Sequence, residues 1–489
     1  MDCSKTKQHS WIFPTVILCI YGFFSMARPS EPFIIPYLIG PEINLTLSQV
    51  SNHMFPIWTY SYLALLFPVF VLTDYLRYKP VIILQGVSYV ITWVLLVFSR
   101  GLLAMQVLEF FYGMATATEV AYYSYIYSVV DVEHYQKVTS YCRSITLVAF
   151  TAFSVLGQLL VSLANVTYFY LNVITMVCLS LALVSSFFLP MPQRSMFFHK
   201  KPTAKESSPG SPDEESPSHG SSVSLEGGII SESPTKSGIQ QESCPPGLQH
   251  KNLMLRVFLQ WCQDLKECYL TKHLLFWSIW WASSTAGFNL VLNYVQVLWD
   301  HKAPSQNSQV YNGAVEAVAT FGGALASLAV GYLKINWDLW GELALGIFSV
   351  LDAASVLLMR FTSNIWVCYA GFLIFKSGYM LLITIAVFQI AVNLSMERYA
   401  LVFGVNTFMA LVIQTIITFI VVDSKGLSLP VETQFLVYGS YFFVIAGIFI
   451  VRSIYIIYSI KCKKEKRATI TNLNPSEGKP EKCIESTKL

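Results

Sequence analysis

The stretch PVIILQGVSYVITWVLLVFS, residues 80–99, decides the fold class of this chain. It carries no charged side chain, and about 20 mostly apolar residues in a helix are enough to cross the hydrocarbon core of a membrane. Comparable apolar runs recur outward from it along the chain. They predict about twelve membrane spans, at roughly 11–27, 54–73, 80–99, 103–127, 138–163, 168–190, 274–298, 310–333, 338–359, 364–394, 399–422 and 434–458.

The overall composition also indicates an all-α integral membrane protein. Of the 489 residues, 54% are hydrophobic and 12% are charged, whereas about 25% of the residues in a soluble domain are charged. The mean hydropathy is +0.52. A soluble domain has to present polar residues to water, so this chain is not expected to fold as one.

Several functional classes are disfavoured by motifs that the sequence lacks. It contains neither the G-x-x-x-x-G-K-[ST] motif of a nucleotide-driven pump nor the H-E-x-x-H motif of a zinc enzyme. The eight histidines fall in tails, loops or span ends. The net charge of +3 comes without a basic stripe for nucleic acid. We therefore predict a protein that is not an enzyme and that uses no cofactor or metal.

The basic residues between the spans predict the orientation in the membrane. Most of them, including the basic run at 461–467, face the cytosol if the N-terminus does, which satisfies the positive-inside rule. Both termini are then cytosolic. Asn44 begins an N-x-[ST] sequon in the first external loop and is a predicted glycan site, whereas the sequon at Asn165 lies in a much shorter loop and is a weaker candidate. The sequon at Asn393 falls at a cytosolic span end, where no glycan is expected.

A change of composition divides the chain into two sets of six spans. Residues 200–250 are rich in Ser, Pro, Gly, Glu and Lys, which predicts disorder. The predicted organisation is an N-terminal six-helix half (1–190), a largely disordered cytosolic linker (191–272), a C-terminal six-helix half (273–460) and a cytosolic tail (461–489). Apolar residues at helical spacing near 253–270 favour an amphipathic helix at the inner membrane surface, and the alternative is an extension of span seven. Two such halves are typical of the major facilitator architecture, whose substrate site lies between them.

Ionisable residues within the predicted spans mark a candidate site, because inserting one costs at least about 2.5–3.5 kcal/mol. We single out seven: Arg28 and Glu31 just after the first span, and Glu109, Glu119, Arg143, Glu316 and Lys376 within later spans. Three prolines surround Glu31 within residues 28–36 and disfavour a regular helix. Irregular backbone at membrane depth has to face protein or a water-filled cavity. Glu31 is therefore predicted to face a central cavity, and the alternative is that it pairs with Arg28 at the outer rim.

The fourth predicted span carries a polar stripe, since steps of three and four residues place Glu109, Tyr112 and Glu119 on one face. For Glu119 we favour a structural pair with Arg143. The other candidate cavity residues come from spans two, three, seven and eight: Phe55, Trp58, Trp93, Asn293 and Glu316. Anchoring at the membrane interface is the alternative role for the tryptophans. Carboxylates and ring faces together attract cations, so the predicted substrate is a flat organic cation.

Four segments of the chain resemble the reduced-folate carrier family of the major facilitator superfamily. They are SEPF (30–33), TDYLRY (73–78), EVAYY (119–123) and YNGAVEA (311–317). The resemblance covers nearly the whole chain except residues 200–250 and the C-terminal tail. It implies uptake of thiamine across the plasma membrane by alternating access without ATP hydrolysis, with pyridoxine and other organic cations as secondary substrates.

The resemblance also implies roles for individual residues. Glu109 and Asn293 would hydrogen-bond the aminopyrimidine of thiamine. The expected ring contacts are Phe55, Trp58 and Tyr112, and the expected charge-compensating neighbours are Glu31 and Glu316. Phe150 departs from the tyrosine expected at its position, so any contact through that hydroxyl is absent from this chain.

Two other functions stay open on the sequence. A reduced-folate carrier would bind an anion and would need Arg143 and Lys376 at the ligand rather than as partners of acidic groups. A non-transporting nutrient receptor or a membrane enzyme is disfavoured, because no catalytic constellation is visible and a receptor has no evident need for buried carboxylates in two six-span halves.

Overall fold

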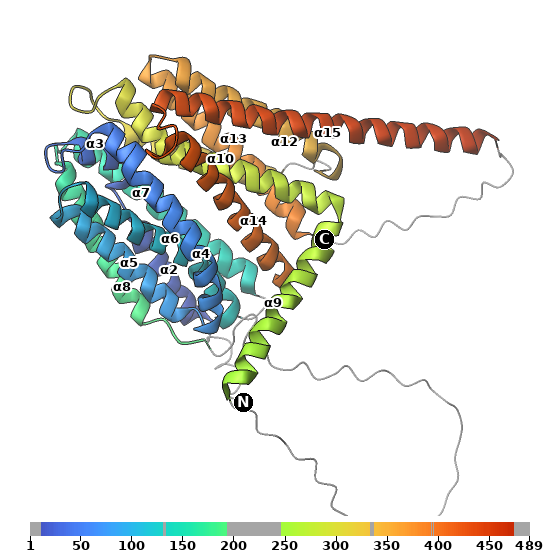
Figure 1. The fold of residues 1–489 in the computed structure, drawn as a ribbon, viewed down its shortest axis with the longest axis horizontal. Helices are drawn as coiled ribbons and strands as arrows, with labels where there is room; N and C mark the ends of the chain where they lie inside the picture. Colours follow the sequence, from blue (N-terminus) through green and yellow to red (C-terminus); the bar gives the residue numbers. More distant parts are fainter. Residues whose placement is uncertain are drawn as a thin grey trace, which may run out of the picture.

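The computed structural model describes residues 11–130, 134–192, 246–332, 337–392, 394 and 396–473, and every regular element in these ranges is a helix. Most of the segment predicted to be disordered, the third sequon at Asn393 and the last sixteen residues of the chain lie outside the described residues. Below, residues 11–192 are called the N-terminal part and residues 246–473 the C-terminal part (Figure 1).

The helices begin and end close to the predicted spans, except that the last helix continues from the predicted end at 458 to Leu473. Those of the N-terminal part are α2 (Ile12–Met26), the 3₁₀ turn η1 (Glu31–Phe33), α3 (Ile34–Ile39), the π-helical stretch η2 (Gln49–Met54), α4 (Phe55–Tyr75), α5 (Lys79–Phe98), α6 (Leu102–Val129), α7 (Tyr135–Ser162) and α8 (Tyr168–Phe187). Those of the C-terminal part are α9 (Pro246–Leu270), α10 (Lys272–Lys302), α11 (Asn312–Tyr332), α12 (Trp337–Phe361), α13 (Ile365–Ala391), α14 (Met396–Ile417), the π-helical stretch η4 (Thr418–Val422) and α15 (Val431–Leu473).

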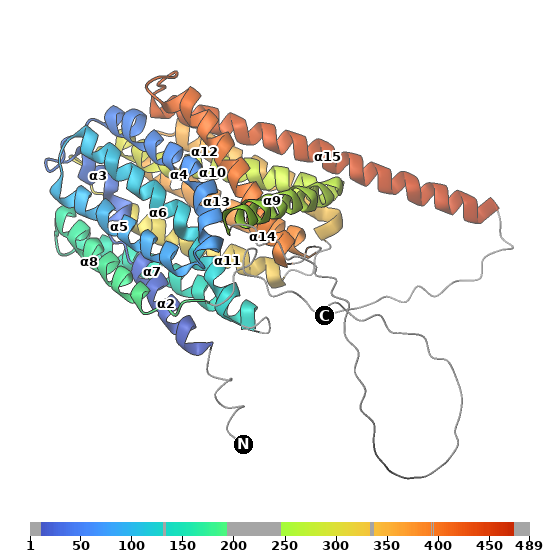
Figure 2. The same cartoon turned by 60° about the horizontal axis from the view of Figure 1, so that its bottom comes forward.

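Helices of the same part pack mainly on one another. In the N-terminal part α6 lies against α4 and α5, and α2 lies against α7 and α8. In the C-terminal part α12 lies against α13 and α15, and α10 lies against α13, α14 and α15. The main helix contacts between the parts are α7 with α11 and α4 with α14. Figures 1 and 2 show the two sets side by side, one coloured blue to green and the other yellow-green to red.

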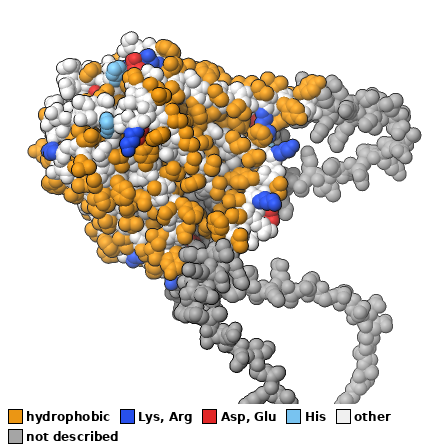
Figure 3. Space-filling view, viewed as in Figure 1, with side chains coloured by type: hydrophobic (Ala, Val, Ile, Leu, Met, Phe, Trp, Pro, Cys, Tyr) orange, Lys and Arg blue, Asp and Glu red, His pale blue; other side chains and the backbone are white. Residues whose placement is uncertain are grey.

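The outer surface of the helices is strongly apolar. In Figure 3 hydrophobic side chains cover most of the visible face, and lysines, arginines and acidic side chains are few. Ten helices among the described residues are long and apolar enough to cross a membrane. The long helices α6 and α10 are not among these ten. Both carry polar side chains that line the cavity described below, which lowers their hydropathy without shortening them.

The proline-rich segment after α2 positions the first cavity residue. The chain leaves the helix at Ala27, turns through Pro29 and Ser30, and resumes as η1 and α3. Helix α7 approaches this turn so closely that a Cβ at Gly157 would lie 2.5 Å from the Pro29 carbonyl oxygen. A glycine at this position therefore permits the contact, and it fixes the irregular backbone that carries Glu31.

Hydrogen bonds between the two parts gather at one end of the helices, where α2 and α10 end and α4 begins. Tyr60 donates to the Asp423 carboxylate, and the Asn52 amide donates to Ser428 Oγ at 2.7 Å. Nearby, the Gln158 amide donates to the Val310 carbonyl oxygen at 2.8 Å. This end of the two parts is therefore held together by polar contacts.

Helix α9 is separate from α10, because residue Thr271 between them has an extended backbone. It begins at Pro246, earlier than the predicted start near 253, and packs against α14 and α10. Arg398 of α14 pairs with Asp264 and Glu267 of α9, at 3.4 Å and 2.8 Å. The position of α9 at the membrane surface stays a prediction.

Candidate substrate cavity

Seven of the eight predicted substrate residues line a single cavity of about 160 Å³. They are Glu31, Phe55, Trp58, Trp93, Glu109, Tyr112 and Asn293. The cavity lies where α3, α4, α5 and α6 of the N-terminal part meet α10 of the C-terminal part. Six of these seven residues come from the N-terminal part, and Asn293 joins them because the two parts face each other.

Aromatic rings form one wall of the cavity. The Tyr112 ring lies at the centre of this wall, with its centroid 6.4 Å from that of Trp58 and 6.3 Å from that of Trp93. The indole nitrogen of Trp58 donates to Thr116 Oγ1 at 3.2 Å, and that of Trp93 donates to Ser30 Oγ at 3.2 Å. Because both indole N–H groups have partners, the two rings are held in place where they line the cavity.

Arg28 and Glu31 form an ion pair next to this wall. The Arg28 guanidinium lies 3.4 Å from the Glu31 carboxylate and 5.0 Å from the centroid of the Tyr89 ring. Tyr112 Oη donates to Glu31 Oε1 at 3.2 Å. The pairing that the sequence offered as an alternative is therefore present, and Glu31 lines the cavity at the same time.

Glu109 and Asn293 face the cavity from opposite parts of the chain. Glu109 on α6 is 6% exposed, and Asn293 on α10 is half-buried. Neither side chain has a hydrogen-bond partner among the described residues. A carboxyl group and an amide without partners can together accept from and donate to the edge of a heteroaromatic ring, which is the chemistry of a recognition site.

Residues 9–437 match the reduced folate carrier family. The chain belongs to this family. It is 64% identical to thiamine transporter 2 of Macaca fascicularis and 63% identical to thiamine transporter 2 of Homo sapiens, over 100% of both chains in each case. It is 41% identical to the reduced folate transporter of Homo sapiens, over 91% of this chain and 72% of that one.

The fold is also that of solved membrane transporters. A bacterial homologue of the human lysosomal transporter Spinster, in an inward-facing and unoccupied conformation, matches with a TM-score of 0.58 at 10% identity. The match covers 91% of this chain and 97% of that chain. Together with the apolar helices, family membership makes this protein a multi-pass membrane transporter of major-facilitator-like fold, and not an enzyme.

Glu316, the eighth predicted substrate residue, is not among the residues that line this cavity. Its carboxylate on α11 lies 2.6 Å from the Lys376 ammonium on α13, and Lys376 also donates to Thr320 Oγ1 at 3.1 Å. The Lys376 ammonium lies 5.7 Å from the ring centroid of Phe150, across the boundary between the parts. Glu316 therefore neutralises a half-buried lysine, and its contact with a substrate stays a prediction.

The predicted pair of Glu119 and Arg143 has a different geometry. The Arg143 side chain is exposed, and its guanidinium lies over the Tyr123 ring, 5.4 Å from the centroid. No salt bridge joins Arg143 to Glu119 in the described structure. The helix spacing that placed Glu119 near the fifth span did not specify the rotamer of the long arginine side chain, which reaches the neighbouring ring instead.

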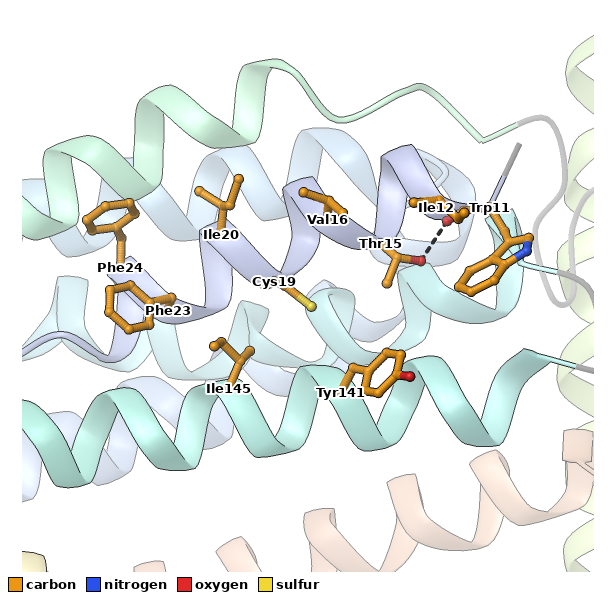
Figure 4. Close-up of a pocket in the computed structure, with 10 residues that line it drawn as sticks. All are labelled: Trp11, Ile12, Thr15, Val16, Cys19, Ile20, Phe23, Phe24, Tyr141 and Ile145. Atoms are coloured by element: carbon orange, nitrogen blue, oxygen red, sulfur yellow. Dashed lines mark hydrogen bonds between the residues drawn. The ribbon is translucent and has the colours of Figure 1, made fainter. Parts of the chain in front are cut away.

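A larger crevice of about 440 Å³ lies between α2 and α7 (Figure 4). Its lining is almost wholly apolar: Trp11, Ile12, Thr15, Val16, Cys19, Ile20, Phe23, Phe24, Tyr141 and Ile145. The Thr15 hydroxyl, one of the few polar groups there, donates to the Trp11 carbonyl oxygen at 2.6 Å. An apolar crevice offers no orienting polar group to a charged solute, so the smaller polar cavity is the better candidate.

The cavity also contains residues that the sequence analysis missed. Gln296 lines it one helical turn after Asn293, and Thr92 lines it one residue before Trp93. The i, i+3 spacing of Asn293 and Gln296 on one helix face was a signal for Gln296. Thr92 had no such signal, and its hydroxyl donates to the Ser88 carbonyl oxygen at 2.8 Å.

The Lys376–Glu316 pair generates a stability prediction. Lys376→Met should lower the thermal unfolding temperature of the detergent-solubilised protein, because it leaves Glu316 buried without its cation, and breaking such a pair costs about 3–5 kcal/mol. The double variant Lys376→Met/Glu316→Leu should recover much of this loss. Size-exclusion profiles after a heating series would measure both, and a single variant as stable as the parent would refute the structural role.

Proposed function

We propose that this protein takes up thiamine across the plasma membrane by alternating access, without ATP hydrolysis. This proposal rests on Glu109 and Asn293, which line the same cavity as the rings of Trp58 and Tyr112. Neither side chain forms a hydrogen bond with another described residue. Thiamine combines an aminopyrimidine with a permanently cationic thiazolium ring. A carboxylate and ring faces attract such a cation, and a desolvated cation–ring contact contributes about 2 kcal/mol or more.

The polar edge and the rings of thiamine match the side chains that line the cavity. The edge of an aminopyrimidine presents an N–H donor beside a ring nitrogen acceptor, which suits a carboxyl group and an amide. We assign this edge to Glu109 and Asn293. The rings of the substrate would then pack on Phe55, Trp58 and Tyr112, with Trp93 behind Tyr112 and Glu31 as a charged neighbour. Pyridoxine and other flat organic cations of similar size are proposed secondary substrates.

The distribution of charge supports a cation over a reduced folate. A folate is an anion and would need free basic side chains at the ligand. Arg28 and Lys376 are paired with Glu31 and Glu316, and Arg143 is not among the cavity-lining residues. The relatives named thiamine transporter 2 are also much more similar to this chain than the human reduced folate transporter is.

We further propose twelve spans in two six-helix halves with both termini in the cytosol. Helices α6 and α10, of 28 and 31 residues, would be the two spans added to the ten apolar ones, because each is longer than the roughly 20 residues needed. The end of the helices that carries the hydrogen bonds between the parts would then be extracellular. Asn44 and Asn165 lie exposed at this end, Asn44 being the preferred glycan site.

The orientation can be tested with epitope tags at either terminus. We expect antibodies to bind both tags only after the plasma membrane of expressing cells has been permeabilised. A tag inserted next to Asn44 should instead be accessible on intact cells. Staining of a terminal tag on intact cells would contradict the proposed topology.

The transport proposal is tested by measuring uptake of labelled thiamine and labelled reduced folate side by side in cells expressing the chain. We expect thiamine to accumulate above the control cells and folate not to do so. Folate uptake without thiamine uptake would support the anion carrier and direct attention to Arg143 and Lys376. Thiamine that binds but never enters would support a nutrient receptor.

Glu109→Gln should reduce the kcat/KM of thiamine uptake by about tenfold or more, since a hydrogen bond to a charged group contributes about 1.5–3 kcal/mol. Uptake would be normalised to the amount of protein at the cell surface. Glu42→Gln is the matched control, because Glu42 lies in the loop after α3 and outside the cavity lining. Undiminished uptake by the Glu109 variant would remove this residue from the site.

A further inference from the structure

Gln296 occupies an unusual position in the wall of the substrate cavity. It lies on α10 of the C-terminal part, and its side-chain nitrogen donates to the backbone oxygen of Glu31 in the N-terminal part at 3.2 Å. A backbone carbonyl can only accept, so the Gln296 amide has to present its NH₂ group to Glu31. The direction of the amide oxygen is thereby determined as well.

That oxygen has no partner. Gln296 Oε1 is buried and accepts no hydrogen bond from any described residue. Two other polar groups lie nearby: Thr92 Oγ1 bonds the Ser88 carbonyl oxygen, and Glu31 Oε2, which has no hydrogen-bond partner of its own, lies 3.4 Å from the Arg28 guanidinium. A buried acceptor without a donor is unfavourable, and a ligand that brings an N–H or O–H group to this wall would relieve the cost.

The place of Gln296 along α10 indicates which ligand group this is. Three residues after Asn293, it lies about 4.5 Å further along the helix axis on the same face. The proposed function assigns the aminopyrimidine to Glu109 and Asn293, and the inference rests on that assignment. The hydroxyl of the hydroxyethyl arm is then the one remaining strong hydrogen-bond donor of thiamine.

We propose that Gln296 determines specificity by accepting a hydrogen bond from the hydroxyl of the substrate's side arm through Oε1. The bond from its amide nitrogen to Glu31 orients the acceptor. Selection for this hydroxyl is then separate from the recognition of the pyrimidine and from the attraction of the positive charge. A cation without a donor at this place would still enter the cavity but would leave the acceptor unsatisfied.

The test compares thiamine with its analogue in which ethyl replaces hydroxyethyl, both as unlabelled competitors of labelled thiamine uptake. In the parent protein the analogue should compete about three- to tenfold more weakly, the effect of one neutral hydrogen bond. In Gln296→Met, thiamine should weaken by a similar factor while the ethyl analogue stays within about twofold of its value in the parent. The preference for the hydroxyl would thus disappear.

Two further variants separate recognition from structure. Gln106→Met is the matched control, because the Gln106 amide also donates to a backbone oxygen, that of His53 at 3.0 Å, but lies outside the cavity lining. It should keep the preference for the hydroxyl. Gln296→Glu retains an acceptor oxygen but, as a carboxylate, cannot donate to the Glu31 carbonyl oxygen. It should keep a preference for the hydroxyl that is weaker than in the parent, which provides a reading if the methionine variant does not reach the cell surface.

Equal weakening of both competitors in Gln296→Met would mean that Gln296 only supports the cavity wall, and this outcome overturns the inference. An unchanged preference for the hydroxyl in that variant overturns it as well. Failure of the proposed function looks different, because the parent protein itself would then take up no labelled thiamine.

Discussion

The ion pair of Arg28 and Glu31 is the interaction on which the cavity depends. A charge placed in the hydrocarbon region without a partner is expensive, and an ion pair there is tolerated when further polar groups satisfy it. Tyr112 donates to the Glu31 carboxylate, and the Arg28 Nε–H group donates to the Ser25 carbonyl oxygen at 2.8 Å. The pair thereby ties the end of α2 to α6 beside the candidate cavity.

The helix is interrupted between α2 and α3, and both parts of the chain contact the interrupted segment, which carries Glu31. Because η1 and its flanking turns leave backbone oxygens free of a regular helix, the C-terminal part can bond to them. The Gln296 amide donates to the Glu31 carbonyl oxygen, and the Asn312 amide donates to the Pro32 carbonyl oxygen at 3.1 Å. The close approach at Gly157 holds the same segment from the other side. A rearrangement of the two parts against each other would have to exchange these bonds. The segment after α2 therefore contributes both to the candidate cavity and to the contacts between the parts.

Much of the fold could be predicted from the sequence, because the membrane imposes length and polarity on every span. The run at 80–99 is α5 within one residue at each end, and the first predicted span, 11–27, is α2 within one residue. Cavity residues were also predictable in kind, since an intramembrane carboxylate such as Glu109 needs a functional explanation. The partners of long charged side chains were not predictable. Lys376 forms an ion pair with Glu316, and Arg143 lies over the Tyr123 ring without a salt bridge to Glu119.

Taken alone, the sequence determined that this protein is helical, that it crosses the membrane many times and that acidic and aromatic side chains lie within its spans. These properties follow from local composition, since each span has to satisfy the bilayer by itself. Only the tertiary structure decided which of those side chains share a cavity, because Asn293 and Glu109 meet through contacts between elements almost two hundred residues apart. The proposed role of Gln296 likewise depends on the tertiary structure. Its spacing placed it on the face of Asn293, but the bond that orients its amide and leaves its oxygen free exists only where α10 meets the turn after α2.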